Sequence, residues 1–298
     1  MNKVSISLIA LPLVGVIGVG KVQAQITQAN DGTGTTVTTN NNNNNQTDIT
    51  GGTISNNGNG TNQFHSLTQF NVDAGKTANF EAANGNISNI LTRITGGNVS
   101  TINGTIQVTG GNNPNLFLMN PAGFIFGNGA TLSLPGSLTV TTANGIGFGS
   151  NGSNFFNATD SNNYAALTGD PTAFVFTMEK PGAIINSEDL SVNEGENLTL
   201  LGGTVVNTGK LEAPNGQITI AAVPGKNIVR ISQQGNLLSL DIESTTGNTN
   251  PLPNKLTIES LPNLLTGGNI SNVTGITVND NGTVVLTGSN ISVSKSAQ

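Results

Sequence analysis

Short apolar runs separated by turn residues recur along the chain, and the most apolar stretch beyond Ala24 is 112–132, NNPNLFLMNPAGFIFGNGATL. Its apolar runs, Leu116–Met119 and Phe124–Phe126, are bounded by Asn-Pro pairs and by glycines. Runs of this length between such breakers are typical of buried strands that meet at tight corners. A helix is disfavoured because Pro121 lacks a backbone N–H and its ring clashes with the preceding turn.

A motif of two glycines followed by alternating polar and apolar residues recurs from Thr50 onward. It reads TGGTIS at 50–55, TGGNVS at 95–100, LGGTVV at 201–206 and TGGNIS at 266–271. The last copy is followed by a related TGSNIS at 287–292, and NLTL at 197–200 is followed by QITI at 217–220. These neighbouring copies start about 20 positions apart, which predicts a solenoid of short strands whose side chains alternate inward and outward.

A parallel β-helix satisfies this pattern, because stacked rungs pair each backbone group with the rungs above and below. A rung cannot bury its apolar face alone, so the stack needs a capped end. We expect residues 25–37 to form an N-terminal cap, since they precede the first full rung and must cover an open edge. The only helix signal lies at Ser88–Arg93, and we expect residues 157–167 to form a loop that leaves the body of the helix.

The composition supports an all-β protein and narrows its chemistry. Of the 298 residues, 39 are glycine, 35% are hydrophobic and only 9% are charged, which argues against disorder driven by charge. The net charge is −6, and it becomes −8 once Lys3 and Lys21 of segment 1–24 are left out. Such an acidic chain is not expected to bind nucleic acid. The absence of cysteine excludes disulfides, thiolate metal sites and thiol nucleophiles.

Segment 1–24 has the organisation of a secretory signal peptide. Lys3 gives a positive start, Val4–Val19 is apolar, and Val22 and Ala24 are small residues before a cleavage point at Gln25. The alternative is a transmembrane anchor, but the apolar part is shorter than the roughly 20 residues that a span needs and is interrupted by Pro12. We therefore predict a signal peptide at 1–24.

Several segments in a fixed order carry a family resemblance. They are NQFHSL at 62–67 and QFNV at 69–72, NILTRITG at 89–96, GTI at 104–106, NLFLMNPAGFIFG at 115–127 and TTAN at 141–144. Together they resemble the N-terminal secretion domain of filamentous-haemagglutinin-type exoproteins, the two-partner secretion (TPS) domain of Gram-negative bacteria. The segment Asn120–Phe124 matches the N-P-[NA]-G-[IF] signature of that family. The chain departs from the family at Phe124, where Ile is usual, and at Gln63, where Leu is common.

This resemblance covers about residues 25–225 and implies a right-handed parallel β-helix, a single-stranded solenoid of the pectin-lyase type, with an N-terminal cap. We place the signal peptide at 1–24, the TPS domain at 25–245 and additional β-helix rungs at 246–298. No cofactor is implied.

The resemblance also implies a route of export. The general secretory pathway would deliver the chain to the periplasm. An outer-membrane β-barrel transporter with periplasmic POTRA-type modules would then recognise it unfolded. The chain would fold outside the cell as a monomer, secreted or at the cell surface, with adhesion or surface interaction as its downstream role. The lack of cysteine suits this route, because a disulfide formed in the periplasm would close a loop before the chain threads the barrel.

Five residues are candidates for transporter recognition or for folding: Asn120, Pro121, Gly123, Arg93 and Asn115. Asn120 and Pro121 either form part of what the transporter reads or shape a corner, since Asn tolerates unusual backbone angles and Pro fixes φ. Arg93 either pairs with an acidic group of the barrel or satisfies carbonyls at a rung corner. His65 is the only histidine, so we expect a buried, hydrogen-bonded corner residue and no metal site or catalytic triad.

The alternative function is a secreted β-helical polysaccharide-degrading enzyme, because other parallel β-helices have such activities. These enzymes need clustered carboxylates with a basic residue, often with calcium. The clearest acidic group comprises Glu188, Asp189, Glu194 and Glu196. We interpret it as a solvated loop, with a weak calcium site as the alternative, and expect no catalytic residues.

Overall fold

The computed structural model describes residues 26–40, 45–149, 154–223, 225–234, 237–244, 275–278, 284–287 and 291–293. The predicted signal peptide at 1–24 lies outside these residues. The described residues are built almost wholly from strands, with two short 3-10 helices, η1 (Asn56–Gly58) and η2 (Tyr164–Ala166). Within these ranges no helix has the length and apolar character to cross a membrane. The all-β prediction is confirmed.

The largest sheet, called wall A here, follows the order β1-β5-β7-β10-β13-β19-β22, with β4 also paired to β5. From β5 to β22 every pair is parallel, and one register column runs from Gln63 to Ile218. Leu198 lies beside Ile218, as the repeat of NLTL and QITI predicts. The strands are β1 (Ile26–Gln28), β4 (Thr53–Ile54), β5 (Asn62–Phe70), β7 (Asn89–Ile94), β10 (Asn115–Met119), β13 (Leu138–Thr141), β19 (Leu198–Gly202) and β22 (Ile218–Ala222).

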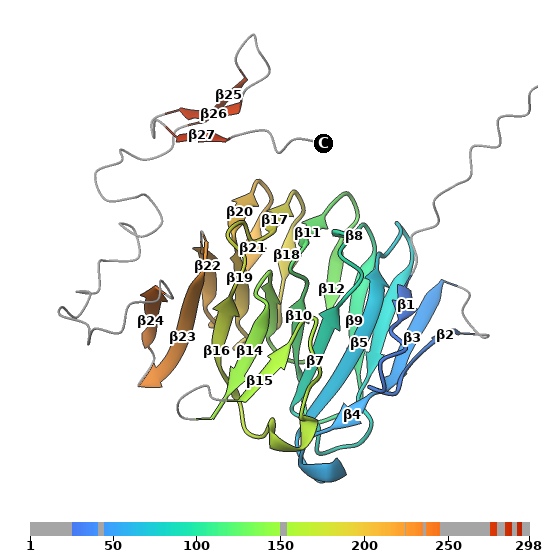
Figure 1. Ribbon diagram of the computed structural model, residues 1–298. Helices are drawn as coiled ribbons and strands as arrows, with labels where there is room; N and C mark the ends of the chain where they lie inside the picture. Colours follow the sequence, from blue (N-terminus) through green and yellow to red (C-terminus); the bar gives the residue numbers. More distant parts are fainter. Residues whose placement is uncertain are drawn as a thin grey trace, which may run out of the picture.

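Two further walls complete the solenoid (Figure 1). Wall B has the order β12-β9-β6-β3-β2, with β2 (Thr35–Thr39), β3 (Gln46–Gly51), β6 (Thr77–Glu81), β9 (Thr105–Thr109) and β12 (Thr131–Ser133). Wall C has the order β20-β17-β11-β8, with β8 (Ser100–Ile102), β11 (Gly123–Phe126), β17 (Ala183–Asn186) and β20 (Thr204–Asn207). In the last two rungs a short parallel pair follows wall C: β18 (Leu190–Ser191) comes after β17, and β21 (Leu211–Glu212) comes after β20.

The predicted parallel β-helix is therefore present. Successive rungs place Ile49, Phe80, Ile102, Leu118 and Val140 in one apolar core enclosed by the walls. The double-glycine motifs at 96–97 and 202–203 lie at corners between walls A and C, where the chain leaves β7 and β19. The apolar runs of 112–132 are the strands β10 and β11, as their spacing predicts.

The N-terminal segment caps the helix as expected. Strand β1 pairs antiparallel with β5 at the edge of wall A, and β2 pairs antiparallel with β3 at the edge of wall B. These antiparallel strands occupy the free edges that the first rung would otherwise present. We call residues 26–39 the cap.

An antiparallel sheet that the sequence did not predict leaves the helix after β13. This outer sheet has the order β15-β14-β16-β23-β24, with β14 (Gly145–Phe148), β15 (Asn154–Asn157), β16 (Pro171–Phe176), β23 (Asn227–Gln234) and β24 (Leu237–Ser244). It covers the outer face of wall A and forms a second core there, in which Phe148, Phe156 and Phe174 pack with Phe64 and Leu91. The expected loop at 157–167 connects β15 to β16 and contains η2.

One expectation needs correction. The helix signal at Ser88–Arg93 is wrong, because Asn89–Ile94 is strand β7 and all six residues are buried. Pairing with β5 and β10 and burial of both faces override the local preference. Within 246–298, the described strands β25 (Gly275–Val278), β26 (Val284–Thr287) and β27 (Ile291–Val293) pair antiparallel with one another. The additional rungs expected at 246–298 stay a prediction. The domain boundaries stay predictions.

Candidate functional site

The Asn-Pro corner at 120–121 is held by hydrogen bonds from neighbouring rungs. The fully buried Asn120 side chain donates from Nδ2 to the Asn98 carbonyl (2.9 Å) and to Ser100 Oγ (3.0 Å). Its Oδ1 accepts the backbone N–H of Ala122 (3.0 Å), and its own N–H donates to the Thr141 carbonyl (3.0 Å). Asn120 thus joins three successive passes of the chain.

The next two candidates shape the same corner. The Pro121 carbonyl accepts the N–H of Gly182 (3.0 Å), which lies on the following rung. Gly123 has a φ of +120°, and a Cβ at that position would lie 2.6 Å from the Ala183 carbonyl oxygen. Only glycine fits so close to the next rung, in a conformation that other residues rarely adopt. The NPAG segment is therefore a tight corner on which the next rung rests directly.

Asn115 belongs to a column of asparagines on the outer face of wall A. Each is the first residue of its strand, and side-chain bonds run from Asn115 Nδ2 to Asn89 Oδ1 (3.0 Å) and from Asn89 Nδ2 to Asn62 Oδ1 (2.9 Å). Asn62 Nδ2 donates to the carbonyls of Leu167 (2.9 Å) and Gly169 (2.8 Å). We call these three residues the asparagine column. Their regular spacing along the sequence was the signal that could have revealed it.

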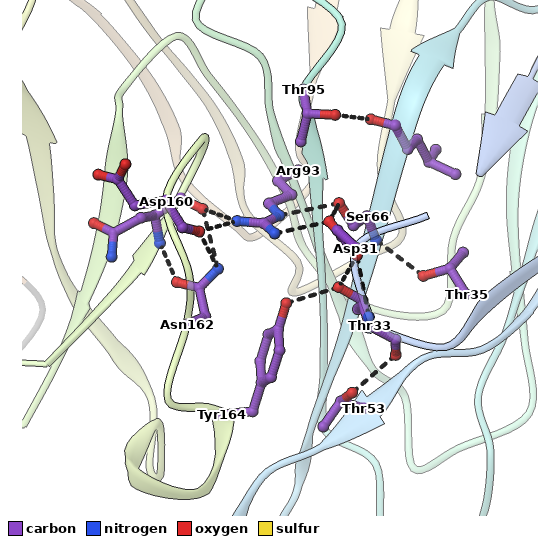
Figure 2. A network of polar contacts seen from close by, with 12 residues as sticks. Asp31, Thr33, Thr35, Thr53, Ser66, Arg93, Thr95, Asp160, Asn162 and Tyr164 are labelled. Atoms are coloured by element: carbon purple, nitrogen blue, oxygen red, sulfur yellow. Dashed lines mark hydrogen bonds and ion pairs between the residues drawn. The ribbon is translucent and has the colours of Figure 1, made fainter. Parts of the chain in front are cut away.

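Arg93 is the residue before the last in β7, with its side chain 5% exposed. Its Nε donates to Ser66 Oγ (3.0 Å), and its Nη2 lies 2.8 Å from Asp31 Oδ2. Its Nη1 donates to the carbonyls of Asn157 (2.8 Å) and Asp160 (2.6 Å). Figure 2 shows the guanidinium between the cap on one side and the 157–164 segment on the other. Arg93 therefore binds two carbonyls from near the end of strand β7. Its role in transporter recognition or folding stays a prediction.

Asp31 is the partner that sequence reasoning missed, since it reads only as part of an Asp-Gly turn. Its carboxylate also accepts bonds from Ser66 Oγ (2.5 Å) and from the N–H (3.0 Å) and Oγ1 (2.6 Å) of Thr33. Burial acts to raise the pKa of Asp31, but the bonds from Ser66, Thr33 and Arg93 outweigh it and hold that pKa well below its usual range. The group is therefore ionised wherever the fold is intact near neutral pH.

An aromatic cluster surrounds this network. The ring of Phe64 lies 5.0 Å from that of Phe156, 5.2 Å from Tyr164 and 6.1 Å from Phe148, between ring centroids. The Tyr164 hydroxyl lies 2.8 Å from Thr33 Oγ1, and the Arg93 guanidinium carbon lies 5.9 Å from the centroid of the Phe156 ring. The apolar rings shield the ion pair from water on this side, which strengthens its electrostatic attraction.

The TPS secretion domain is the family whose model matches this chain, over residues 24–272. The chain belongs to the TPS secretion domain family. A similar solved structure is the crystal structure of the HMW1 secretion domain from Haemophilus influenzae, with 20% sequence identity and a TM-score of 0.45. That alignment covers 74% of this chain and 48% of the other, so this chain spans about half of the HMW1 domain's length. No curated protein matches the chain. The family inferred from the sequence motifs is confirmed.

His65 of this TPS domain lies inside the β-helix. It is fully buried in the middle of β5, so the expected burial is confirmed but the expected corner position is wrong. Its Nε2 lies 3.1 Å from Gln63 Nε2, while its Nδ1 and the Oγ1 of its register neighbour Thr92 have no partner among the described residues. Burial lowers the pKa of His65 to about 4, so the imidazole is neutral in the folded protein.

Three of the four acidic residues of the alternative enzyme hypothesis bind separate neighbours through their side chains. Asp189 Oδ1 accepts the N–H of Lys210 (2.9 Å), and Glu194 Oε1 accepts Asn215 Nδ2 (2.7 Å). Glu196 Oε2 accepts the hydroxyl of Ser137 (2.7 Å). In the part of the chain that the structure describes, no three His, Cys, Asp or Glu side chains are grouped to hold a metal ion.

Proposed function

We propose that this chain is a secreted exoprotein whose TPS domain directs its own export through a dedicated outer-membrane β-barrel transporter with periplasmic POTRA-type modules. The family match over 24–272 is the observation that carries this proposal. The signal-peptide pattern at 1–24 supports entry through the general secretory pathway. The destination is the medium or the cell surface.

The burial of the motif residues indicates when a transporter could read them. Asn120 is fully buried, Arg93 is 4% exposed, and their polar side-chain atoms are bonded within the fold. A partner that binds these side chains must therefore meet the chain before it folds. After export the same residues form the corners and contacts of the first rungs, so we infer that the domain also nucleates β-helix folding.

For the downstream role we propose adhesion or surface interaction by a monomer. The stacked walls form long surfaces for contact with a partner. At the N-terminal end, antiparallel strands of the cap cover the strand edges that could otherwise pair with another copy of the chain. The polysaccharide-degrading alternative gains no support from the described residues, because the side chains of Asp189, Glu194 and Glu196 bind separate neighbours.

Export in the bacterium that makes this chain tests the proposal. Deleting the gene for the barrel transporter is expected to leave the chain in the periplasm, and restoring the gene is expected to return it to the surface or medium. A periplasmic enzyme serves as the control for cell leakage. Undiminished arrival outside the cell without the transporter would refute the proposal.

A further inference from the structure

The segment 157–170 contacts both the cap and the first strands of wall A, and these contacts span the largest distances in sequence within the polar network. Thr33 Oγ1 meets the Tyr164 hydroxyl across 131 residues, and Asn62 donates to Leu167 and Gly169 across 105 and 107. Asn89 Nδ2 also reaches Asp170 Oδ1 at 3.2 Å. We call residues 157–170 the latch segment. It lies beside the cap although three rungs separate the two in sequence (Figure 2).

We propose that the latch segment and the cap hold each other in place on wall A. The cap then cannot pack stably on the first rung until residues 157–170 have folded. The proposal concerns folding within the domain and does not depend on the export route proposed above. If rungs were simply added one after another, the cap would become stable before residues 157–170 had folded. The coupling proposed here makes the cap stable only afterwards.

Arg93 contacts the cap and the latch segment at the same time. Its guanidinium binds the cap through Asp31 and the latch segment through the carbonyls of Asn157 and Asp160. Before the latch segment arrives, two of these acceptors are missing at a position that is buried in the folded state. A guanidinium with donors unpaired in such a place is costly, so its bond to Asp31 cannot stabilise the cap in full.

Side chains from both parts also share one shielded cluster. Tyr164 of the latch segment contributes its ring to the cluster around Phe64 and its hydroxyl to Thr33 of the cap. Thr33 in turn donates to Asp31, which accepts from Arg93. A change at Tyr164 is therefore transmitted to the carboxylate that fixes the cap. Bonds in such a chain reinforce one another.

The consequence is a minimum length for a stable domain. The wall A strands from β5 to β13 are complete by Thr141, yet the asparagine column and Arg93 gain their last partners only at residues 157–170. The smallest cooperative unit thus extends from the cap at Ile26 through the latch segment. A chain that appears progressively would keep an open cap while more than a hundred residues follow it.

Hydrogen exchange on the full chain with Tyr164→Phe tests the coupling. This change removes one hydroxyl from the latch segment and keeps the ring. We expect about fivefold faster exchange at the cap amides of Ala29 and Thr33, which donate to the Ser66 carbonyl and to Asp31. Thr172→Val is the matched control, because it removes a hydroxyl of β16 that donates to the Gly149 carbonyl and does not touch the cap. It is expected to leave cap exchange unchanged.

The reverse experiment uses Thr33→Val in the cap. Coupling between two sites is reciprocal. We therefore expect faster exchange at the latch amides of Ala158 and Leu167, which donate to the carbonyls of Asn144 and Tyr164. Either variant carries the test if the other fails to fold. Acceleration confined to the mutated segment would overturn the proposal. The proposal would also be overturned if the fold-acceleration of exchange in the double variant equalled the product of the fold-accelerations in the two single variants, because the two sites would then act independently.

Discussion

Arg93 and Asp31 form an ion pair of 2.8 Å that joins the second rung of the β-helix to its cap. The arginine side chain is 5% exposed and the carboxylate side chain 27%, so one partner is buried while the other keeps some contact with water. The remaining guanidinium donors point to Ser66 and to the latch segment. The pair therefore acts through its geometry as much as through its charge, since a planar fork reaches all of these acceptors at once.

Replacing Arg93 with lysine is expected to destabilise the domain although the positive charge remains. Lysine cannot reach Asp31, Ser66 and two carbonyls together, and the loss should be about 2 kcal/mol, from two or more hydrogen bonds to a charged group. The urea midpoint of the full chain measures this loss of stability, and the dependence of the unfolding free energy on urea concentration should be unchanged. Lys210→Met provides the control, because the pair of Lys210 with Glu212 is exposed and should leave the midpoint unchanged. Equal midpoints for Arg93→Lys and the native chain would contradict this role.

Acidification is expected to weaken the fold through His65 before it affects Asp31. The pKa of His65 is about 4 in the fold against 6.5 in an ordinary environment, so the unfolded chain binds the proton first. Stability should fall as the pH drops from 6.5 towards 4, by roughly 3 kcal/mol in all, and this contribution should then level off. Urea midpoints at pH 7, 5.5 and 4.5 measure the slope, which should be much smaller in His65→Gln.

Asp31 contributes in a lower pH window with the same direction. Its pKa in the fold lies below the usual 3.8, so the stability it provides is complete above about pH 4 to 5 and is lost as the pH falls further. Asp31→Asn should therefore be less stable than the native chain at pH 7, and the difference should shrink below pH 4. A difference that stays constant down to pH 2.5 would show that the carboxylate is not the group concerned.

The glycine of the NPAG corner is expected to tolerate no side chain. In Gly123→Ala the new Cβ would meet the Ala183 carbonyl, in a backbone conformation that alanine avoids, at a cost of about 2 kcal/mol or more. Gly85→Ala is the control, because nothing lies within 4 Å of its Cβ position and its φ is not in the positive range. Thermal unfolding followed by circular dichroism compares the two, and a similar midpoint for both would contradict the packing argument.

Asn120→Asp separates folding from recognition. Aspartate keeps an acceptor for the Ala122 N–H but cannot donate to Asn98 and Ser100, so the folded domain should lose about 2 kcal/mol. We expect the unfolded variant to bind the periplasmic modules of the proposed transporter with nearly native affinity, measured for the native and the variant chain at one urea concentration that unfolds both. A large loss of that affinity would instead assign Asn120 to direct recognition.

The sequence predicted the solenoid because its signals are local. The runs at 116–119 and 124–126 became β10 and β11, and the double glycines at 96–97 and 202–203 became corners, since alternation and turn residues act within a few positions. The outer sheet was not predicted, because the sequence patterns of β14 and β16 indicate strands but do not indicate which strands they pair with. Their antiparallel partners are set by packing on wall A, which no short window of sequence records.

The same distinction explains the site. Asn120 and Gly123 were identified because their motif is contiguous, and Arg93 because it lies in an ordered set of segments that match the family. Asp31 and Tyr164 were missed, since each is a single polar residue in a loop and meets its partners only after the rungs have stacked. Their roles come from sequence separations of 62 and 131 residues.

The register column of wall A gives the molecule a direction. It begins with the amide of Gln63, continues through Ile90, Leu116, Leu138 and Leu198, and ends with Ile218. Gln63 pairs with Ile54 of β4 and has no exposed surface, whereas Ile218 is 38% exposed. Within the described residues, one end of the column is thus polar and closed, and the other is apolar and open to receive another strand. A stack built in this way has a polarity of growth, because it can lengthen at one end only.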